Sequence, residues 1–394
     1  MNYDKFLNQR IRDIKPSGIR KFFDVADIYK DVISLGVGEP DFDTPWSARK
    51  SAIDSIRNGN TQYTSNSGLP ALRKAIGEYL SDRYGLQYEP MQEIFVTVGA
   101  SEAIDLALRA IIESGDEIII PEPSYVSYSP LVSLCYGKAV AAPCYMQDEF
   151  ALMPDHLESV ITPRTKALIL PYPNNPTGAI MTRSQLEAIA EIVERHDLLV
   201  ISDEIYSELT YGGKHVSIAS LPNMRERTIV INGFSKAFAM TGWRVGYVCA
   251  PHPLIEQMLK IHQYAIMCAT TASQYAALTA LHQSFSDHYA GIEQMREQYD
   301  MRRRYLVAKL NEIGLATFEP RGAFYVFPCV RALGMDGEEF ANRLLQEEHV
   351  AVVPGEAFGD VGKDFVRISY AYSIASLEKA MAKIERFVRR HLGK

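Results

Sequence analysis

The chain has 394 residues, of which 47% are hydrophobic, and this is enough apolar material for a large core shared by two or more domains. Its 41 basic and 48 acidic residues give a net charge of −7, which argues against a nucleic-acid-binding protein. No apolar run approaches membrane-spanning length and the first residues lack a secretory signal, so we expect a cytoplasmic protein that does not bind a membrane.

The N-terminal 45 residues predict an arm and a loop rather than part of a continuous core. The pattern is polar and partly helical to residue 30, and residues 32–38 predict a short strand that runs into a glycine turn. Prolines and aspartates then predict a loop. Two helices are expected next, over residues 47–58 and 69–84.

From residue 93 to about residue 281, short apolar runs alternate with helical patterns. This alternation predicts an α/β fold with a mainly parallel sheet covered by helices. The runs are continuously apolar, as expected for strands that are buried on both faces. The expected strands span residues 94–98, 117–120, 167–170, 198–201, 228–231 and 245–248.

A long charged helix pattern over residues 288–314 leads into a final region of mixed helices and strands. The patterns there predict strands over residues 323–327, 350–353 and 365–369 and helices over 336–349 and 376–392. We therefore expect residues 1–45 to form an arm and part of a small domain, 46–287 a large domain, and 288–394 the rest of the small domain.

Polar clusters follow five successive strands of the expected sheet. Ligands of open parallel sheets bind beyond the carboxyl ends of the strands, so these clusters predict a site. Gly99-Ala-Ser101 opens a helix and could bind a phosphate, although Ser101 could equally be a plain N-cap. Tyr125 offers an aromatic ring, and Asn175 offers an amide donor or an ordinary turn residue.

The next two strand ends carry an acid and an amine. Asp203 ends an apolar run, where a carboxylate is costly to bury without a cationic partner. Tyr206 follows three residues later. Lys236 comes after the next strand, close to Ser235 and Arg244. A lysine that can form a Schiff base beside groups that can hold a phosphate is what pyridoxal phosphate requires.

With these motifs the chain resembles the fold-type I pyridoxal-phosphate enzymes of the class I/II aminotransferase family. The resemblance implies a large domain with a mainly parallel seven-stranded sheet flanked by helices, and a smaller α+β domain built from the N- and C-terminal segments. Other motifs that run in the family order are Gly38-Glu-Pro-Asp-Phe42, Asn174-Asn-Pro-Thr-Gly178, Thr241-Gly-Trp-Arg244, Gly322-Ala-Phe-Tyr325 and Arg367.

The resemblance also implies a reaction and its catalytic residues. Lys236 would hold pyridoxal phosphate as an internal aldimine and then move the proton at the substrate Cα. The amino group of an L-amino acid would pass to a 2-oxo acid by a ping-pong mechanism. Asp203 would pair with the pyridinium nitrogen, and Tyr206 would hydrogen-bond the ring oxygen.

Further binding roles are implied for residues that match family motifs. Tyr125 would stack on the cofactor ring, and Asn175 would join Tyr206 at the ring oxygen. Arg367, helped by the backbone of Gly38, would bind the substrate α-carboxylate, with Tyr125 and Asn175 also lining the substrate site. The phosphate would be held by Gly99, Ala100, Ser101, Ser235 and Arg244, and by Tyr63 of the other subunit of a homodimer.

The identity of the amino donor stays open. Some relatives that act on acidic substrates carry a lysine where this chain has Ser101, which leaves Arg20 and Arg321 as possible contacts for a distal carboxylate. The patterns Ser17-Gly-Ile-Arg20 and His262-Gln-Tyr264 are most similar to bacterial aminotransferases for aromatic amino acids or N-acetyl-diaminopimelate.

The sequence leaves alternatives to transamination. A C–S β-lyase would use the same cofactor and is the main alternative. A serine hydrolase is less well supported, because residues 233–237 and 99–103 match G-x-S-x-G only in part. A DNA-binding regulator does not fit the short arm and the acidic charge. Five irregularly spaced cysteines and nine histidines without an HExxH pattern predict no metal site.

Overall fold

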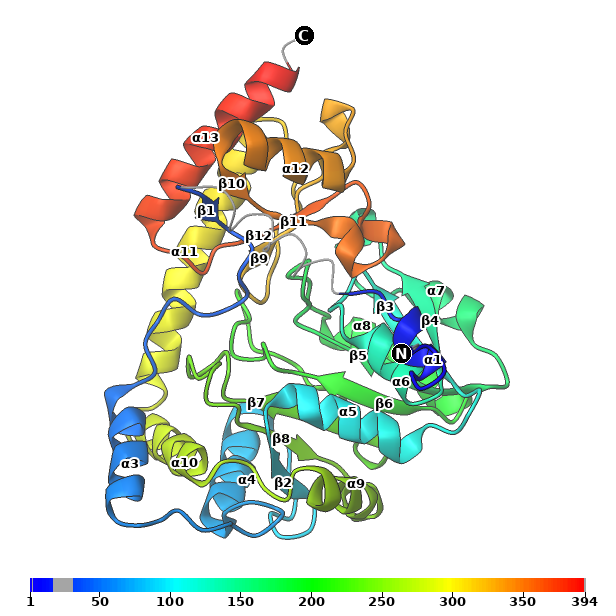
Figure 1. The fold of residues 1–394 in the computed structure, drawn as a ribbon, viewed down its shortest axis with the longest axis vertical. Coiled ribbons are helices and arrows are strands. Elements are labelled where there is room, and N and C mark those ends of the chain that lie inside the picture. Colours follow the sequence, from blue (N-terminus) through cyan, green and yellow to red (C-terminus); the bar gives the residue numbers. More distant parts are fainter. Residues whose placement is uncertain (2, 17–30, 393–394) are drawn as a thin grey trace.

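The computed structural model describes residues 1, 3–16 and 31–392. Figure 1 shows a sheet-based lower part and a helical upper part that are joined along one side by the long helix α11. No helix in these described ranges is long and apolar enough to span a bilayer.

The lower part is built on a seven-stranded sheet in the order β2-β8-β7-β6-β5-β3-β4. All neighbouring strands are parallel except that β8 runs antiparallel to both β2 and β7. This confirms the mainly parallel seven-stranded sheet. The strands are β2 Ile94–Thr97, β3 Glu117–Glu122, β4 Lys138–Pro143, β5 Thr165–Leu170, β6 Leu199–Asp203, β7 Thr228–Gly233 and β8 Gly246–Cys249.

The strands of this sheet other than the edge strand β4 are buried on both faces. Within β3, Ile118 and Ile120 pack in one apolar cluster with helix α5, whereas Ile119 lies in the cluster on the other face with helix α8. Successive side chains of a strand point to opposite faces, so a doubly covered strand must be apolar throughout. The helices of this part are α3 Trp46–Arg57, α4 Pro70–Tyr84, α5 Ala100–Ile111, α6 Tyr128–Leu134, α7 Pro154–Val160, α8 Arg183–Arg195, α9 His252–Ala265 and α10 Thr271–Ser286.

The upper part combines the two ends of the chain. Strand β1 (Ile33–Ser34) pairs in parallel with β10 (Val350–Ala351), which brings the segment before residue 45 against the C-terminal region. A three-stranded antiparallel sheet has the order β11-β12-β9. The remaining elements are α11 Ala290–Glu312, β9 Tyr325–Val326, β11 Val353–Pro354, β12 Val366–Ser369, α12 Gly337–Glu348 and α13 Ile374–Leu392.

Smaller elements complete the described chain. Near the N-terminus, the short helix α1 (Gln9–Asp13) lies beside α6 (Figure 1). The domain boundaries expected after residues 45 and 287 stay predictions. The 3₁₀ turns are η1 Met146–Asp148, η2 Ile218–Ser220, η3 Arg225–Arg227, η4 Arg331–Leu333, η5 Gly355–Phe358 and η6 Asp360–Gly362.

Candidate active site

The carboxyl ends of three adjacent parallel strands bring the main chemical groups to one edge of the sheet. Asn175 follows β5, Asp203 is the last residue of β6, and Lys236 lies just beyond β7. Parallel neighbouring strands end on the same side of the sheet. Asn175, Asp203 and Lys236 therefore lie at the same edge, although helix α8 separates the first of them from the other two in the sequence.

Lys236 lies at the junction of the two parts of the molecule. Its Nζ donates a hydrogen bond to the Gly38 carbonyl oxygen at 2.6 Å and lies 5.6 Å from the centre of the Tyr206 ring. Burial lowers the pKa of Lys236 to about 8, although the Glu39 carboxylate opposes this shift. An amine with such a pKa is partly neutral near physiological pH and can therefore act as a nucleophile.

Asp203 is a carboxylate held by neutral donors. Its side chain accepts hydrogen bonds from the Tyr128 hydroxyl at 2.7 Å and from the Ile205 backbone N–H at 3.2 Å. The residue is only 6% exposed, and burial raises the pKa of Asp203 to about 6 while the Tyr128 hydrogen bond opposes that rise. A buried anion of this kind fits the protonated ring nitrogen of pyridoxal phosphate.

The loops after β2 and before β8 bring an uncapped helix N-terminus and a guanidinium together. Gly99 caps helix α5 with φ 78°, and no side chain caps the first turn of that helix. A Cβ on Gly99 would lie 2.5 Å from Nη2 of Arg244, so the guanidinium lies directly against this glycine. Ser101 is exposed in the first turn of α5. Free N–H groups at a helix N-terminus beside a guanidinium suit a phosphate.

Arg367 is a buried cation on β12 with 3% of its surface exposed. Its Nη1 donates to Oδ1 of Asn175 at 2.8 Å, and its Nη2 donates to the Gly36 carbonyl oxygen at 2.5 Å. Its buried Nε has no hydrogen-bond partner within the described part of the chain. A guanidinium with an unsatisfied donor fits a substrate carboxylate.

The other expected site residues differ in how closely they approach this group. Tyr206 is buried, and its hydroxyl pairs with the Tyr325 hydroxyl at 2.8 Å. The half-buried Tyr125 meets the Tyr128 ring edge-on. Ala100 is the first residue of α5, and Ser235 is buried next to Lys236. Tyr63 is 79% exposed, so its side chain lies on the surface of the subunit.

Two residues that touch this group had no role in the sequence prediction. Tyr325 stands within a recognised motif, and its hydroxyl would lie 2.5 Å from a Cβ on Gly38. Tyr128 contacts Asp203, and its only sequence signal is its position three residues after Tyr125.

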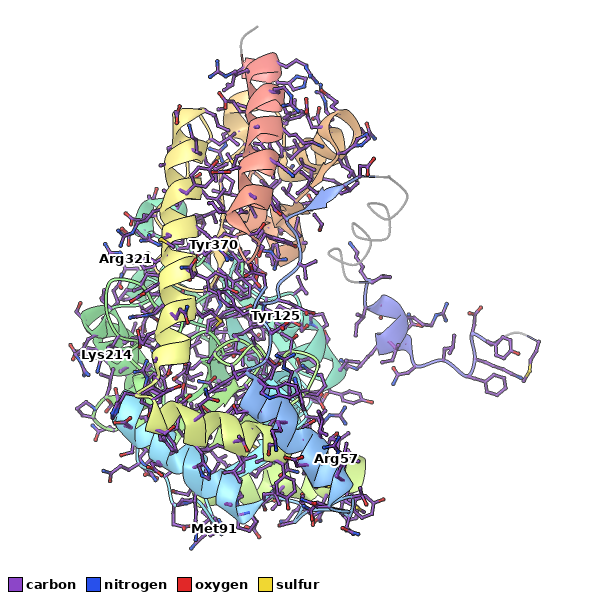
Figure 2. All side chains as sticks on the ribbon, turned by 90° about the vertical axis from the view of Figure 1, so that its left-hand side faces the viewer. Arg57, Met91, Tyr125, Lys214, Arg321 and Tyr370 are labelled. Carbon is purple, nitrogen blue, oxygen red and sulfur yellow. The ribbon has the colours of Figure 1, made fainter. Side chains whose placement is uncertain are left out.

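Of the two arginines expected as possible contacts for a distal carboxylate, the structure describes only Arg321. Arg20 lies outside the described residues. Arg321 is exposed, and Figure 2 shows it at the edge of the molecule, on the other side of α11 from Tyr125. No cluster of metal-ligating side chains occurs among residues 1, 3–16 and 31–392. The amine, the buried acid and the phosphate site together fit pyridoxal phosphate.

Comparisons with known proteins agree with this chemistry. Residues 30–384 match the family model described as "Aminotransferase class I and II". An aspartate aminotransferase from Pyrococcus abyssi is 48% identical, with 97% of this chain and 98% of that protein covered. An aromatic-amino-acid aminotransferase from Thermococcus litoralis is 44% identical over the same shares.

The solved structures match equally well. The aspartate aminotransferase of Thermus thermophilus, determined with maleate, superimposes with a TM-score of 0.92 at 38% identity. The match covers 96% of this chain and 99% of the Thermus chain. The fold and the sequence therefore point to the same relatives.

Proposed function

This chain belongs to the class I and II aminotransferase family and is a transferase of nitrogenous groups, and we propose that it moves the amino group of an L-amino acid to a 2-oxo acid in a ping-pong reaction with pyridoxal phosphate. The observation that carries this proposal is the Lys236 amine, whose pKa burial lowers to about 8, at a strand end next to that of Asp203.

Three residues would take part in the chemical steps of the proposed reaction. When bound, pyridoxal phosphate supplies an electron sink that stabilises negative charge at the substrate Cα. Lys236 would hold the cofactor through its aldehyde group and would carry the proton that moves at the substrate Cα. Asp203 would keep the ring nitrogen protonated, and Tyr206 would donate to the ring oxygen.

Binding falls to a second set of side chains. Arg244, with the first turn of α5 and Ser235, would hold the phosphate. Tyr125 would contact the cofactor ring. Arg367 pairs with the substrate α-carboxylate, and its unpartnered Nε supports this role. Asn175 orients the guanidinium through its side-chain oxygen.

We further propose that the protein is a homodimer in which Tyr63 reaches the phosphate of the partner subunit. Large apolar side chains lie exposed on α3, at Trp46 and Ile56, and at Tyr63 and Tyr264. The segment of Tyr63 is held to the start of α10 by a hydrogen bond that the Thr271 hydroxyl donates to the Gln62 carbonyl oxygen at 2.8 Å. Apolar surface of this kind is typical of a subunit interface. The cytoplasmic location expected from the sequence stays a prediction.

The amino donor is left to experiment, because the relatives are named for both aspartate and aromatic substrates. Nothing in the site or in these relatives favours the C–S β-lyase. The test is an absorbance titration of the holoenzyme with a panel of L-amino acids. A donor should convert the visible absorbance to that of pyridoxamine phosphate, and a 2-oxo acid should restore it. Release of pyruvate and sulfide from cystathionine without an acceptor would instead establish a lyase.

A further inference from the structure

Tyr128 provides the strongest side-chain contact to the acid of the proposed site. It is the first residue of α6 and is 3% exposed. Its hydroxyl lies 2.7 Å from Oδ2 of Asp203, while the Ile205 N–H holds Oδ1 at 3.2 Å. Each carboxylate oxygen therefore has one donor, and the two contacts fix the plane of the carboxylate.

We infer that Tyr128 is a positioning residue that holds Asp203 oriented and ionised for the ring nitrogen of the cofactor, an inference that rests on the proposed function. A hydroxyl stabilises the carboxylate without cancelling its charge. A lysine or arginine in the same place would neutralise Asp203 and compete with the cofactor ring.

The charges around Asp203 make this donor necessary. Burial favours the neutral acid, and the neighbouring Glu204 carboxylate acts in the same direction. Lys236 acts in the opposite direction, together with the donors Tyr128 and Ile205. With a pKa of about 8, the Lys236 amine stays charged in the pH range where Asp203 titrates, and its charge favours the ionised acid. Of the groups that favour the ionised form of Asp203, the Tyr128 hydroxyl acts most strongly, because it donates directly to the carboxylate.

Tyr128 is suited to remain a donor across the physiological pH range. Burial and the charge of Asp203 raise the pKa of Tyr128 well above its usual value, and Tyr125 and Tyr206 act in the same direction. The ring of Tyr128 also meets the Tyr125 ring at 5.6 Å and 82°. Replacement by phenylalanine would keep this ring contact and remove only the hydroxyl.

The experiment measures the dissociation constant of pyridoxal phosphate between pH 5 and pH 9 for full-length wild type and Tyr128→Phe. We expect binding to weaken below about pH 6 in the wild type, as Asp203 takes up a proton. Without the hydroxyl the pKa of Asp203 rises, so this weakening should begin about one pH unit higher. Above pH 8 the two proteins should bind within a fewfold of each other. Phosphate and Lys236 titrate in both proteins, so the difference reports on Asp203.

Tyr79→Phe is the matched control. Tyr79 is equally buried and donates to another buried carboxylate, Glu208, at 2.5 Å, outside the proposed site. It should lose a comparable hydrogen bond without moving the pH profile. A Tyr128→Phe profile that superimposes on that of the wild type, or an equal shift in Tyr79→Phe, would overturn the inference.

A second substitution tests the inference even if Tyr128→Phe does not fold. A fluorinated tyrosine at position 128 keeps the shape and strengthens the donor, so the weakening should move to lower pH. An unchanged or upward-shifted profile would overturn the inference. If wild-type protein binds no pyridoxal phosphate at any pH, the proposed function fails and this inference fails with it. If the wild type binds pyridoxal phosphate but the Tyr128→Phe profile is unshifted, only the inference on Tyr128 fails and the proposed function stands.

Discussion

The Lys236 amine donates a hydrogen bond at 2.6 Å to the carbonyl oxygen of Gly38, a residue 198 positions earlier in the chain. Gly38 follows strand β1, which pairs with β10 near the C-terminus. The amine on the sheet edge is thus covered by backbone from the upper part of the molecule. Both parts of the fold have to be in place before the proposed nucleophile is held and buried.

Replacement of Lys236 by alanine should abolish covalent attachment of the cofactor without unfolding the protein. We expect turnover to fall about 10³-fold or more, because nucleophile and proton carrier are lost together. Borohydride reduction followed by mass spectrometry should find the cofactor fixed to wild type and not to the variant. Lys214→Ala is the control, since Lys214 is an exposed surface lysine (Figure 2). Near-native turnover of Lys236→Ala would reject the proposed mechanism.

The rate of cofactor attachment should follow the protonation of Lys236. Only the neutral amine attacks an aldehyde, and burial lowers the pKa of this amine to about 8. The rate should therefore rise about tenfold per pH unit below pH 8 and level off above it. Stopped-flow absorbance after mixing the free protein with pyridoxal phosphate measures this rate. A rate that keeps rising towards pH 10.4, the ordinary pKa of lysine, would show an unperturbed amine.

The sequence predicted the strand ends well because burial on both faces forces continuous apolar runs. Asp203 ends such a run and Lys236 lies three residues beyond the end of β7, so the sequence placed both at the carboxyl ends of parallel strands. That these two strands are neighbours is seen in the structure. Strand β4 was not predicted. It is an edge strand of lysine, alanine, valine and proline with several exposed positions, and it pairs on one side only.

Contacts that depend on the order of strands in the sheet could not be predicted either, because the sequence does not give that order. The Tyr128 contact with Asp203 joins the segment after β3 to the end of β6, although β5 lies between these strands. Helix α5 begins at Ala100 with Gly99 as its N-cap, so Ser101 is not the N-cap that the sequence also allowed. Arg367 alternates with apolar residues along β12, a pattern that does not predict burial, and the pairing of β12 with β9 and β11 places it in the interior.

Replacement of Arg367 by lysine should weaken substrate binding while leaving the cofactor in place. A lysine can keep the charge, but it cannot contact Asn175, Gly36 and a carboxylate from one planar group. We expect the KM for the amino acid to rise about 10- to 100-fold, with the cofactor content unchanged. Steady-state kinetics and the absorbance of the bound cofactor measure the two effects.

Arg321→Ala is the matched control for that experiment. Its side chain is exposed and lies apart from Tyr125 in the view of Figure 2, so KM should stay within twofold for acidic and aromatic donors alike. A selective rise in KM for acidic donors would restore Arg321 as a contact for a distal carboxylate.

Gly99→Ala should weaken cofactor binding through the phosphate. The new methyl group would meet Nη2 of Arg244 at 2.5 Å, and the guanidinium would have to leave its place beside the first turn of α5. We expect the dissociation constant of pyridoxal phosphate to rise about tenfold or more, since each tenfold change corresponds to about 1.4 kcal/mol. Equilibrium dialysis measures this constant.

Gly59→Ala separates that steric effect from backbone strain. Gly59 has φ 77°, almost the same as the 78° of Gly99, but a Cβ there meets nothing within 4 Å. Both variants should lose folding stability, because an L-residue is strained at positive φ, and the loss should be on the order of 1–3 kcal/mol at Gly99, whose ψ of 167° lies in a region that is almost restricted to glycine. Only Gly99→Ala should lose affinity for the cofactor. Equal affinities in the two variants would remove Arg244 and Gly99 from the phosphate site, whatever the change in melting temperature.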